Sequence, residues 1–244
     1  MQQLNVQENK LKELLSEEEV KYNSLTSSQI PVKIPFSSTN GFIMDTVPKS
    51  LFQLLKNKIS ETDLENKEDS TYAYLAGNIE KELTISNFPE LDSYILELVT
   101  RYSEYFPEFK NDIAKKFNKQ PDPTYVLSDI WVNFQKQHEF NPVHNHHGIF
   151  SFVIWMQIPF TLEEEIRNSP CKRLDEFNQA GCFEFLVPSY TEAGISKCVI
   201  RADERYEGKI ILFPAHIYHT VYPFYTSAFY RISVAGNVFV DKKS

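Results

Sequence analysis

The chain has 244 residues, enough to bury the core of one large domain or of a core domain with an extension. Its formal net charge is -8, and no Lys/Arg-rich block offsets that charge locally. Such a chain repels phosphate backbones, so nucleic acid is excluded as an expected partner. The abundance of aromatic residues, 19 Phe and 13 Tyr against only 7 Gly, favours a β-sandwich or barrel.

The cysteines and the N-terminus indicate the compartment. Cys171, Cys182 and Cys198 form neither a CxxC metal motif nor an obvious disulfide framework, so reduced thiols are the simplest interpretation. The N-terminus lacks a basic start and an apolar signal core, and no run approaches the roughly 20 apolar residues that span a bilayer. We therefore expect a cytoplasmic protein that makes no membrane contact.

The first part of the chain, residues 1–123, is expected to be mainly helical and to pack on the rest. Residues 1–24 carry a narrow leucine stripe amid charge, which predicts a peripheral helix or an interaction arm. Residues 24–40 are rich in Ser, Thr and Pro and predict an extended connector with one edge strand, on Ile30, Val32 and Ile34. Residues 72–83 are ambiguous between a loop and a short helix.

Three helices are predicted from the spacing of leucine and aromatic residues. The first begins near Pro48, after a capping Asp45, and the second begins at residues 87–89 and runs to Pro107, where the third begins. Their predicted buried sides are Leu51, Leu54 and Leu55; then Leu91, Ile95, Leu98, Tyr102 and Tyr105; and then Phe109, Ile113 and Phe117.

From Thr124 the hydrophobic period changes from helical to two. Apolar Ile130, Val132 and Phe134 alternate with Trp131, Asn133 and Gln135, so one strand face is apolar and the other carries amides that could line a pocket. A charged insertion at 161–180 is expected to be a surface excursion, with a lid over the active site as the alternative. Further strands are predicted at 150–158, 182–187, 197–201, 209–213 and 229–240.

These elements predict an α+β fold. Six or seven strands after a helical part indicate an antiparallel double-sheet, jelly-roll or cupin-like barrel in residues 124–244, with the helices of residues 1–123 supporting it from outside.

The histidines carry the candidate chemistry. His144 and His146 stand two apart at the mouth of an apolar run, so both rings project from one face if that strand extends back over them. His219 follows a distant strand-like run, and Arg231 lies twelve residues beyond it. Neutral imidazoles are the commonest ligands of Fe, Zn, Cu and Ni, although histidines also cluster in polar loops. His147 and His216 are expected at the pocket rim or in solvent.

Three stretches together resemble a family. HNH before FSFVIW, LFPAHIYHTVYPF, and RISVAGN are similar to the iron- and 2-oxoglutarate-dependent oxygenases of bacteria and tailed phages. The resemblance covers residues 124–240 closely and residues 75–83 more weakly. It implies a double-stranded β-helix that binds Fe(II) and 2-oxoglutarate, reacts with O2 and hydroxylates a substrate, with release of succinate and CO2. If the chain is phage-encoded, the cytoplasm is that of the host.

The resemblance also implies roles for individual residues. His144 corresponds to the first iron ligand, His219 to the distal ligand, and Arg231 to the arginine that binds the far carboxylate of 2-oxoglutarate. A planar guanidinium suits this last role because it pairs with a carboxylate through two hydrogen bonds. Ser233, on the same strand face, is expected to bond the same carboxylate. Weaker candidates for cosubstrate contacts or for supporting the ligands are Asn133, Gln135 and Asn237.

One position departs from the family pattern. Where the family has Asp or Glu two residues after the first histidine, this chain has His146. Three histidines also leave open coordination positions, but they remove one negative charge from the ion. Either His146 completes the metal site or a remote carboxylate does so, with Asp129 and Glu184 as candidates. Trp131, Trp155, Tyr218 and Tyr222 could help enclose the pocket, although for the two tryptophans a plain core role is the favoured interpretation.

Two other functions stay open. A cupin-like three-histidine metalloenzyme that ignores 2-oxoglutarate is favoured by His146 and disfavoured by Arg231. A non-catalytic jelly-roll binding protein is disfavoured by the Arg231-Ile-Ser233 sequence. The substrate is unassigned between a small molecule and a protein side chain, and a homodimer is an open alternative to a monomer.

Overall fold

The structure, a computed structural model, describes residues 31–65, 77–117, 123–170, 178–189 and 194–241. The helix or arm expected for residues 1–24 lies outside these described residues. The helices are α2 (Lys49–Glu65), α3 (Pro89–Tyr105), α4 (Pro107–Lys116), α5 (Leu162–Asn168) and the 3-10 turn Glu204–Tyr206. The strands are β1 (Val32–Pro35), β2 (Gly41–Thr46), β3 (Lys81–Thr84), β4 (Tyr125–Gln135), β5 (Asn141–His144), β6 (Phe150–Gln157), β7 (Phe183–Pro188), β8 (Ile195–Ile200), β9 (Lys209–Pro214), β10 (Tyr218–Val221) and β11 (Arg231–Val240).

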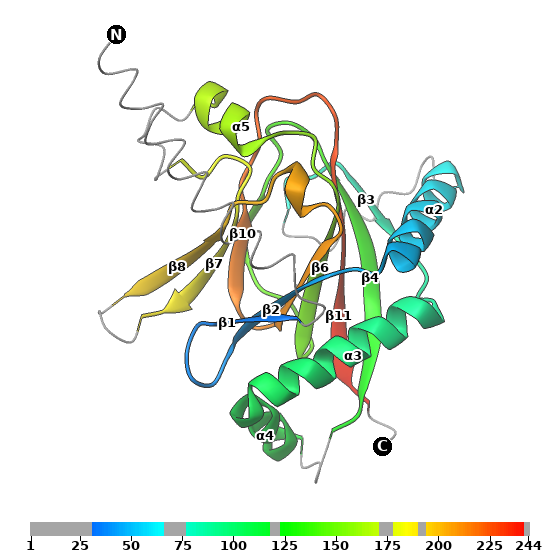
Figure 1. Ribbon diagram of the computed structural model, residues 1–244, viewed down its shortest axis with the longest axis vertical. Helices are drawn as coiled ribbons and strands as arrows, with labels where there is room; N and C mark the ends of the chain where they lie inside the picture. The colour runs from blue at the N-terminus through cyan, green and yellow to red at the C-terminus, as the bar shows by residue number, and fades with distance from the viewer. Residues whose placement is uncertain (1–30, 66–76, 118–122, 171–177, 190–193, 242–244) are drawn as a thin grey trace.

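Two antiparallel sheets form the framework, as Figure 1 shows. The larger sheet has the strand order β1-β2-β9-β6-β11-β4-β3, and the smaller has the order β5-β10-β7-β8. Neighbours are distant in sequence, since β11 pairs with both β4 and β6. The predicted α+β double-stranded β-helix is thereby confirmed.

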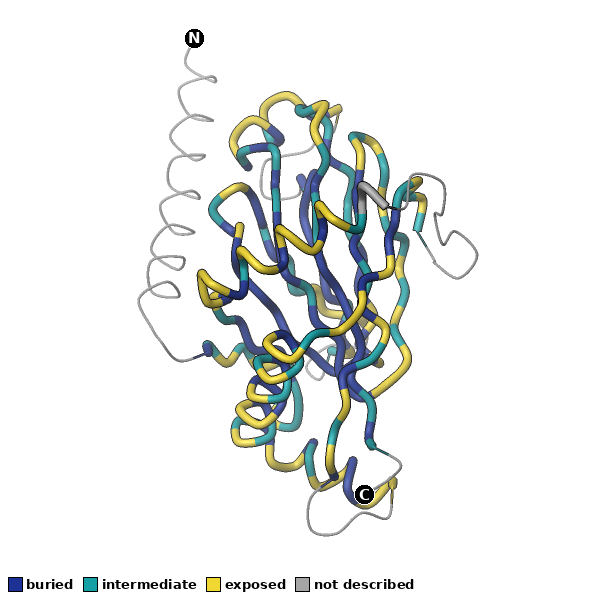
Figure 2. Tube along the Cα trace, turned by 90° about the vertical axis from the view of Figure 1, so that its right-hand side faces the viewer, coloured by how far each residue is buried: buried dark blue, intermediate teal, exposed yellow. Residues whose placement is uncertain are grey.

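Two hydrophobic cores lie on opposite faces of the larger sheet. On one face α2, α3 and α4 pack against Ile130, Val132 and Phe134 of β4 and their neighbours. On the other face, between the sheets, a second core contains Phe183, Phe185 and other aromatic residues. Because side chains alternate along a strand, the face of β4 opposite the helices points between the sheets. Figure 2 shows the buried segments in the interior, with the partly exposed helices at one side.

The predicted helices are confirmed, with two errors at single positions. Pro89 and Pro107 occupy the first turns of α3 and α4, where the missing N–H costs no helical hydrogen bond. Leu54 and Phe117 were expected to be buried, but they are 40% and 41% exposed. The buried sides of α2 and α4 use other positions instead, including Ile59 and Ala114.

Four short strands, β2, β3, β5 and β10, were not predicted. Residues 81–84, at the end of the segment interpreted as a loop or short helix, form β3, so that interpretation is wrong for residues 81–83. Residues 41–46 form β2, which joins the edge strand β1 to β9. His219 follows β9, as expected, and lies inside a further short strand, β10. Each of these strands is specified by its partners more than by its own alternation.

The first part of the chain contributes strands as well as helices. Its β1, β2 and β3 extend both edges of the larger sheet. A division at residues 1–123 and 124–244 stays a prediction. Within the described residues, no helix is long and apolar enough to cross a membrane.

Candidate metal centre

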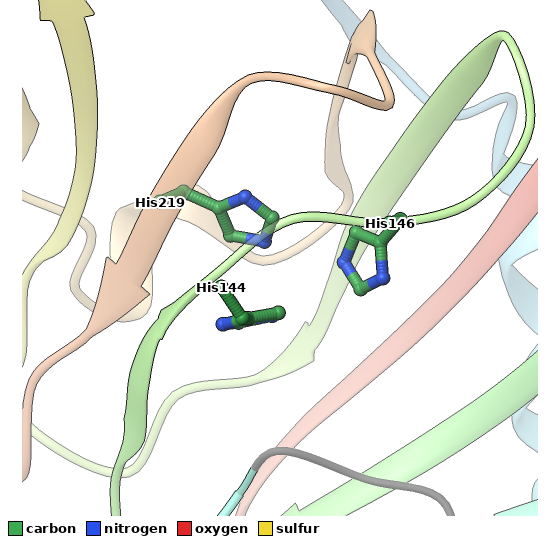
Figure 3. A group of neighbouring side chains, drawn as sticks. All are labelled: His144, His146 and His219. Atoms are coloured by element: carbon green, nitrogen blue, oxygen red, sulfur yellow. The ribbon is translucent and has the colours of Figure 1, made fainter.

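Three histidines converge where the two sheets open. His144 ends β5, His219 lies on β10, and the two are direct partners in the antiparallel pair. Figure 3 shows their rings and that of His146 directed at one common space. The ring centroids are 4.3 Å apart for His144 and His219, and 5.0 Å apart from each of these to His146. The predicted meeting of distant segments therefore takes place.

His146 reaches this space from the loop after β5 and not from a strand. The expectation that it shares a strand face with His144 is therefore wrong, because β5 ends at His144. Its backbone N–H donates to the Ala215 carbonyl at 2.8 Å, which ties this loop to the end of β9. Its ring packs at 5.5 Å from the ring of Trp131 on β4. A loop anchored at both points presents the third imidazole.

Hydrogen bonds orient two of the rings. Nδ1 of His144 lies 2.7 Å from the Pro142 carbonyl, and Nδ1 of His219 lies 3.0 Å from the Ile217 carbonyl. A carbonyl can only accept, so each Nδ1 carries the proton and each Nε2 keeps a free lone pair. This arrangement is typical of metal-binding histidines. Phe183 stacks on the His219 ring at 5.2 Å and fixes its plane.

Burial keeps the three imidazoles neutral. It lowers the pKa of His144 and lowers that of His219 strongly, since His219 is only 2% exposed. The pKa of His146 falls to about 4 through burial and through the neighbouring His144 and His147. Neutral rings are the form that binds a cation.

The three rings fit one metal ion. Their ligand nitrogens all lie within 4.8 Å of one another. Nitrogens bound at about 2.1 Å from an ion can be at most about 4.2 Å apart, so a small inward movement suffices. Imidazole suits iron, zinc, copper and nickel alike.

Neither remote carboxylate joins the cluster. Among the described residues, His144, His146 and His219 are the group of ligand type that could hold an ion. Asp129 is exposed on a bulge of β4 with a φ of 51°, and accepts from the Ser128 hydroxyl at 3.2 Å. Glu184 accepts from Gln179 and pairs with Lys197 at 3.2 Å on the outer side of β7. The expectation of a completing Asp129 or Glu184 is not supported by their positions.

Arg231 is a buried cation in the cavity beside the histidines. It is 5% exposed, and burial lowers its pKa to about 10 against smaller opposing effects of Cys182 and Glu165. Four of its five N–H groups have acceptors, namely Gln135 Oε1 twice and the carbonyls of Gly181 and Tyr222. Within the described chain it forms no ion pair with a carboxylate. A buried guanidinium that no carboxylate contacts directly is costly, so this position favours an anionic ligand.

Two pockets meet at the histidines. The inner pocket is narrow, about 50 Å³, and runs between the sheets from His144, His146 and His219 to Arg231. The outer pocket measures about 420 Å³ and opens from His144 and His146 towards β3. Trp131 and Asn133 line both pockets. An ion at the histidines would therefore stand at their junction.

The remaining predicted residues divide between the pockets. Ser233 and Gln135 line the inner pocket beside Arg231. The Asn133 side-chain amide is assigned the orientation in which both its oxygen and its nitrogen form hydrogen bonds. The oxygen then accepts from Trp131 Nε1 at 3.2 Å, and the nitrogen donates to Glu82 Oε2 at 2.6 Å. Asn237 lines only the outer pocket, where it accepts from the Ser151 hydroxyl at 2.7 Å.

The aromatic predictions were partly wrong. Trp131 and Trp155 both line the inner pocket. Trp155 also belongs to the core between the sheets, the role favoured for both tryptophans, whereas Trp131 is only partly buried. Tyr218 and Tyr222 line neither pocket of the metal centre and lie instead beside hollows elsewhere on the smaller sheet. His147 lies at the rim of the outer pocket, as expected.

Some residues that line the outer pocket were not predicted from the sequence. Glu82, Ile79 and Asn141 line the outer pocket, and none was singled out. Glu82 and Ile79 lie in or near β3, whose four residues carry little pattern of their own. The alternation of amides along β4 was the one available signal, because Glu82 is the direct partner of Asn133.

Comparison with known proteins agrees with this geometry. The model of a family described as "Putative 2OG-Fe(II) oxygenase" matches residues 129–237, the segment that holds all three histidines and Arg231. No curated protein sequence matches the chain.

Solved structures show the same fold. A Pseudomonas putida prolyl-4-hydroxylase is similar with a TM-score of 0.52 at 12% identity, over 84% of this chain and 95% of that one. The non-heme alpha-ketoglutarate-dependent carbocyclase SnoK from nogalamycin biosynthesis gives 0.50 at 11% identity, over 83% and 80%. At this sequence identity the similarity establishes only the fold. The reaction has to be inferred from the residues of this chain.

Proposed function

Because residues 129–237 belong to the 2OG-Fe(II) oxygenase family, we propose that the chain is an Fe(II)- and 2-oxoglutarate-dependent dioxygenase that hydroxylates its substrate. In this proposal His144, His146 and His219 hold the iron, and Arg231 binds the far carboxylate of 2-oxoglutarate. The substrate is a small molecule or a protein side chain, and the enzyme acts in the cytoplasm without nucleic acid.

One observation carries the proposal. The buried guanidinium of Arg231 lacks a carboxylate partner among the described residues and lines the same cavity as three neutral imidazoles. A dicarboxylate whose one end lies at the ion and whose other end reaches Arg231 supplies the missing negative charge. The planar fork of the guanidinium matches a carboxylate better than it matches two backbone carbonyls.

The chain's own residues position and enclose the reactants. The imidazoles of His144 and His219 present Nε2 because their Nδ1 protons are bound to carbonyls. Gln135 fixes the position of the Arg231 guanidinium by accepting two hydrogen bonds from it. Ser233 lies two residues further along β11, on the same face. When bound, iron and 2-oxoglutarate supply, with O2, an oxidant that hydroxylates the substrate and leaves succinate and CO2. Trp131 and Trp155 exclude water from the inner pocket.

A second candidate is a three-histidine metalloenzyme that does not use 2-oxoglutarate. His146, in place of the carboxylate expected there, favours it because three neutral ligands leave the ion with its full charge. Arg231 disfavours it, because the buried cation would then keep no anionic ligand.

Succinate formation distinguishes the two candidates. Purified protein is supplied with Fe(II), 2-oxoglutarate and O2, and succinate is measured for the wild type, His219→Ala and the control His216→Ala. His216 stacks on Phe109 at 6.2 Å outside the cluster, so its loss leaves the three ligands intact. We expect succinate from the wild type and the control, with a loss of about 100-fold or more in His219→Ala. Equal succinate from all three proteins would refute the assignment, and none from the wild type would favour the second candidate.

A further inference from the structure

The outer pocket is large enough to hold a substrate. It measures about 420 Å³, within the range of about 300–1,000 Å³ typical of small-molecule sites. Its floor is formed by His144, His146 and Trp131, and its far wall by β3. A molecule bound here would have one end at the iron and the other at Glu82.

Glu82 is a buried carboxyl group on that wall. It is 8% exposed, and its Oε2 accepts one hydrogen bond from the Asn133 amide. The preceding residue, Lys81, places its ammonium over the rings of Phe134 and Tyr230 on the other face of β3, at 4.3 and 5.8 Å. No lysine or arginine is among the described residues that line the pocket, whereas Glu82 and Asp129 both line it.

This environment is unfavourable for the isolated carboxylate. Burial raises the pKa of Glu82 to about 8. A carboxylate in this position is stabilised when a cation enters the pocket and pairs with it.

We propose that the outer pocket selects substrates that carry a protonated amine and that Glu82 is the specificity-determining residue that binds it. This inference rests on the oxygenase function proposed above, since it concerns the substrate of the same iron site. The Oε2 atom of Glu82 keeps its contact with Asn133, and the second oxygen accepts from the ammonium group. The carbon to be oxidised lies at the opposite end of the pocket, beside His144 and His146.

Three probes of equal length test the charge preference. Hexylammonium, hexanol and hexanoate are titrated by calorimetry into protein loaded with Fe(II) and 2-oxoglutarate under nitrogen, and into metal-free protein. We expect hexylammonium to bind at least about tenfold more tightly than hexanol, and hexanoate to bind most weakly. A preference for hexanol or hexanoate would overturn the proposal.

Variants assign the preference to Glu82. Glu82→Gln keeps the size of the side chain and an acceptor for Asn133, so we expect it to remove the preference for hexylammonium without changing the affinity for 2-oxoglutarate. Glu82→Asp should restore part of it because the charge remains. Glu90→Gln, at an exposed position on α3, is the matched control and should behave as the wild type. An unchanged ratio of hexylammonium to hexanol affinity in Glu82→Gln would contradict the assignment.

The same titrations separate this inference from the proposed function. If the wild type fails to bind Fe(II) or 2-oxoglutarate, the oxygenase proposal is refuted, and the metal-free titrations still decide whether Glu82 binds an amine. If 2-oxoglutarate binds normally and hexylammonium shows no dependence on Glu82, the oxygenase proposal stands and the substrate class is refuted.

Discussion

His144, His146 and His219 illustrate how burial prepares single residues for a metal. Their pKa values are lowered below the ordinary value of 6.5 because the charged imidazolium is poorly solvated at this site. The unbound protein therefore already holds the rings in the neutral form. Protons compete with the metal only when the pH falls to the lowered pKa values.

This predicts an unusual pH dependence of metal affinity. A group with a lowered pKa stays neutral until the pH falls through that value, so affinity should be nearly constant from about pH 8 to about pH 6. It should fall steeply only towards about pH 4, the pKa of His146. Competitive titration of Co(II) or Zn(II) against a chelator across this range measures the effect. A decline of more than about tenfold between pH 7.5 and 6 would mean that the rings titrate as exposed histidines do.

Site residues could be predicted from the sequence where their side chains are typical metal or anion ligands. His144, His219 and Arg231 were identified from spacing and resemblance, and they line one cavity. Glu82 was missed because its environment comes from the pairing of β3 with β4, which lies about fifty residues away in sequence. A buried glutamate has no local signature.

At the scale of elements, α5 holds the loop that leads into β11. Glu165 is 0% exposed and accepts hydrogen bonds from the backbone N–H groups of Tyr225, at 2.9 Å, and Thr226, at 2.7 Å, and from the Thr226 hydroxyl. The same loop provides the Tyr222 carbonyl that accepts from Arg231. The described part of the charged insertion therefore stabilises the loop whose carbonyl contacts Arg231.

Glu165→Gln tests this support. The amide replaces an oxygen with a donor that faces other donors, so we expect a loss of about 2–4 kcal/mol in the free energy of unfolding. Denaturant unfolding followed by circular dichroism measures it. Glu163→Gln on the same helix breaks only an exposed pair with Arg167 and should cost less than about 0.5 kcal/mol. Equal stability of the two variants would show that Glu165 does not anchor the loop.

Long elements were predictable and short ones were not. The apolar spacing of α3 and the alternation along β4 each extend over ten or more residues, so their patterns identify them. The four-residue strands β3 and β10 are too short for a pattern, and they form because neighbouring strands offer hydrogen bonds. The position of His146 in a loop follows from the end of β5, which no periodicity marks.

At the scale of the whole molecule, scaffold and site occupy opposite faces of one sheet. Helices α2, α3 and α4 cover one face of the larger sheet (Figure 1). The inner pocket lies on the opposite face, between the two sheets. The two proposed iron ligands on strands, His144 and His219, and Arg231 therefore lie on hydrogen-bonded strands that pack against buried cores. Such a framework holds the reacting groups at fixed positions, which is what positioning of a cosubstrate requires.

If the three histidines hold the iron, 2-oxoglutarate binds between that iron and Arg231. Titration of 2-oxoglutarate into Fe(II)-loaded protein under nitrogen tests this arrangement most directly. We predict that the wild type and Arg101→Gln, a change on the exposed side of α3, bind 2-oxoglutarate equally. Arg231→Gln should retain iron and bind 2-oxoglutarate at least about 30-fold more weakly, a loss of about 2 kcal/mol or more. If Arg231→Gln retained the wild-type affinity, the buried guanidinium would not be the group that binds the cosubstrate.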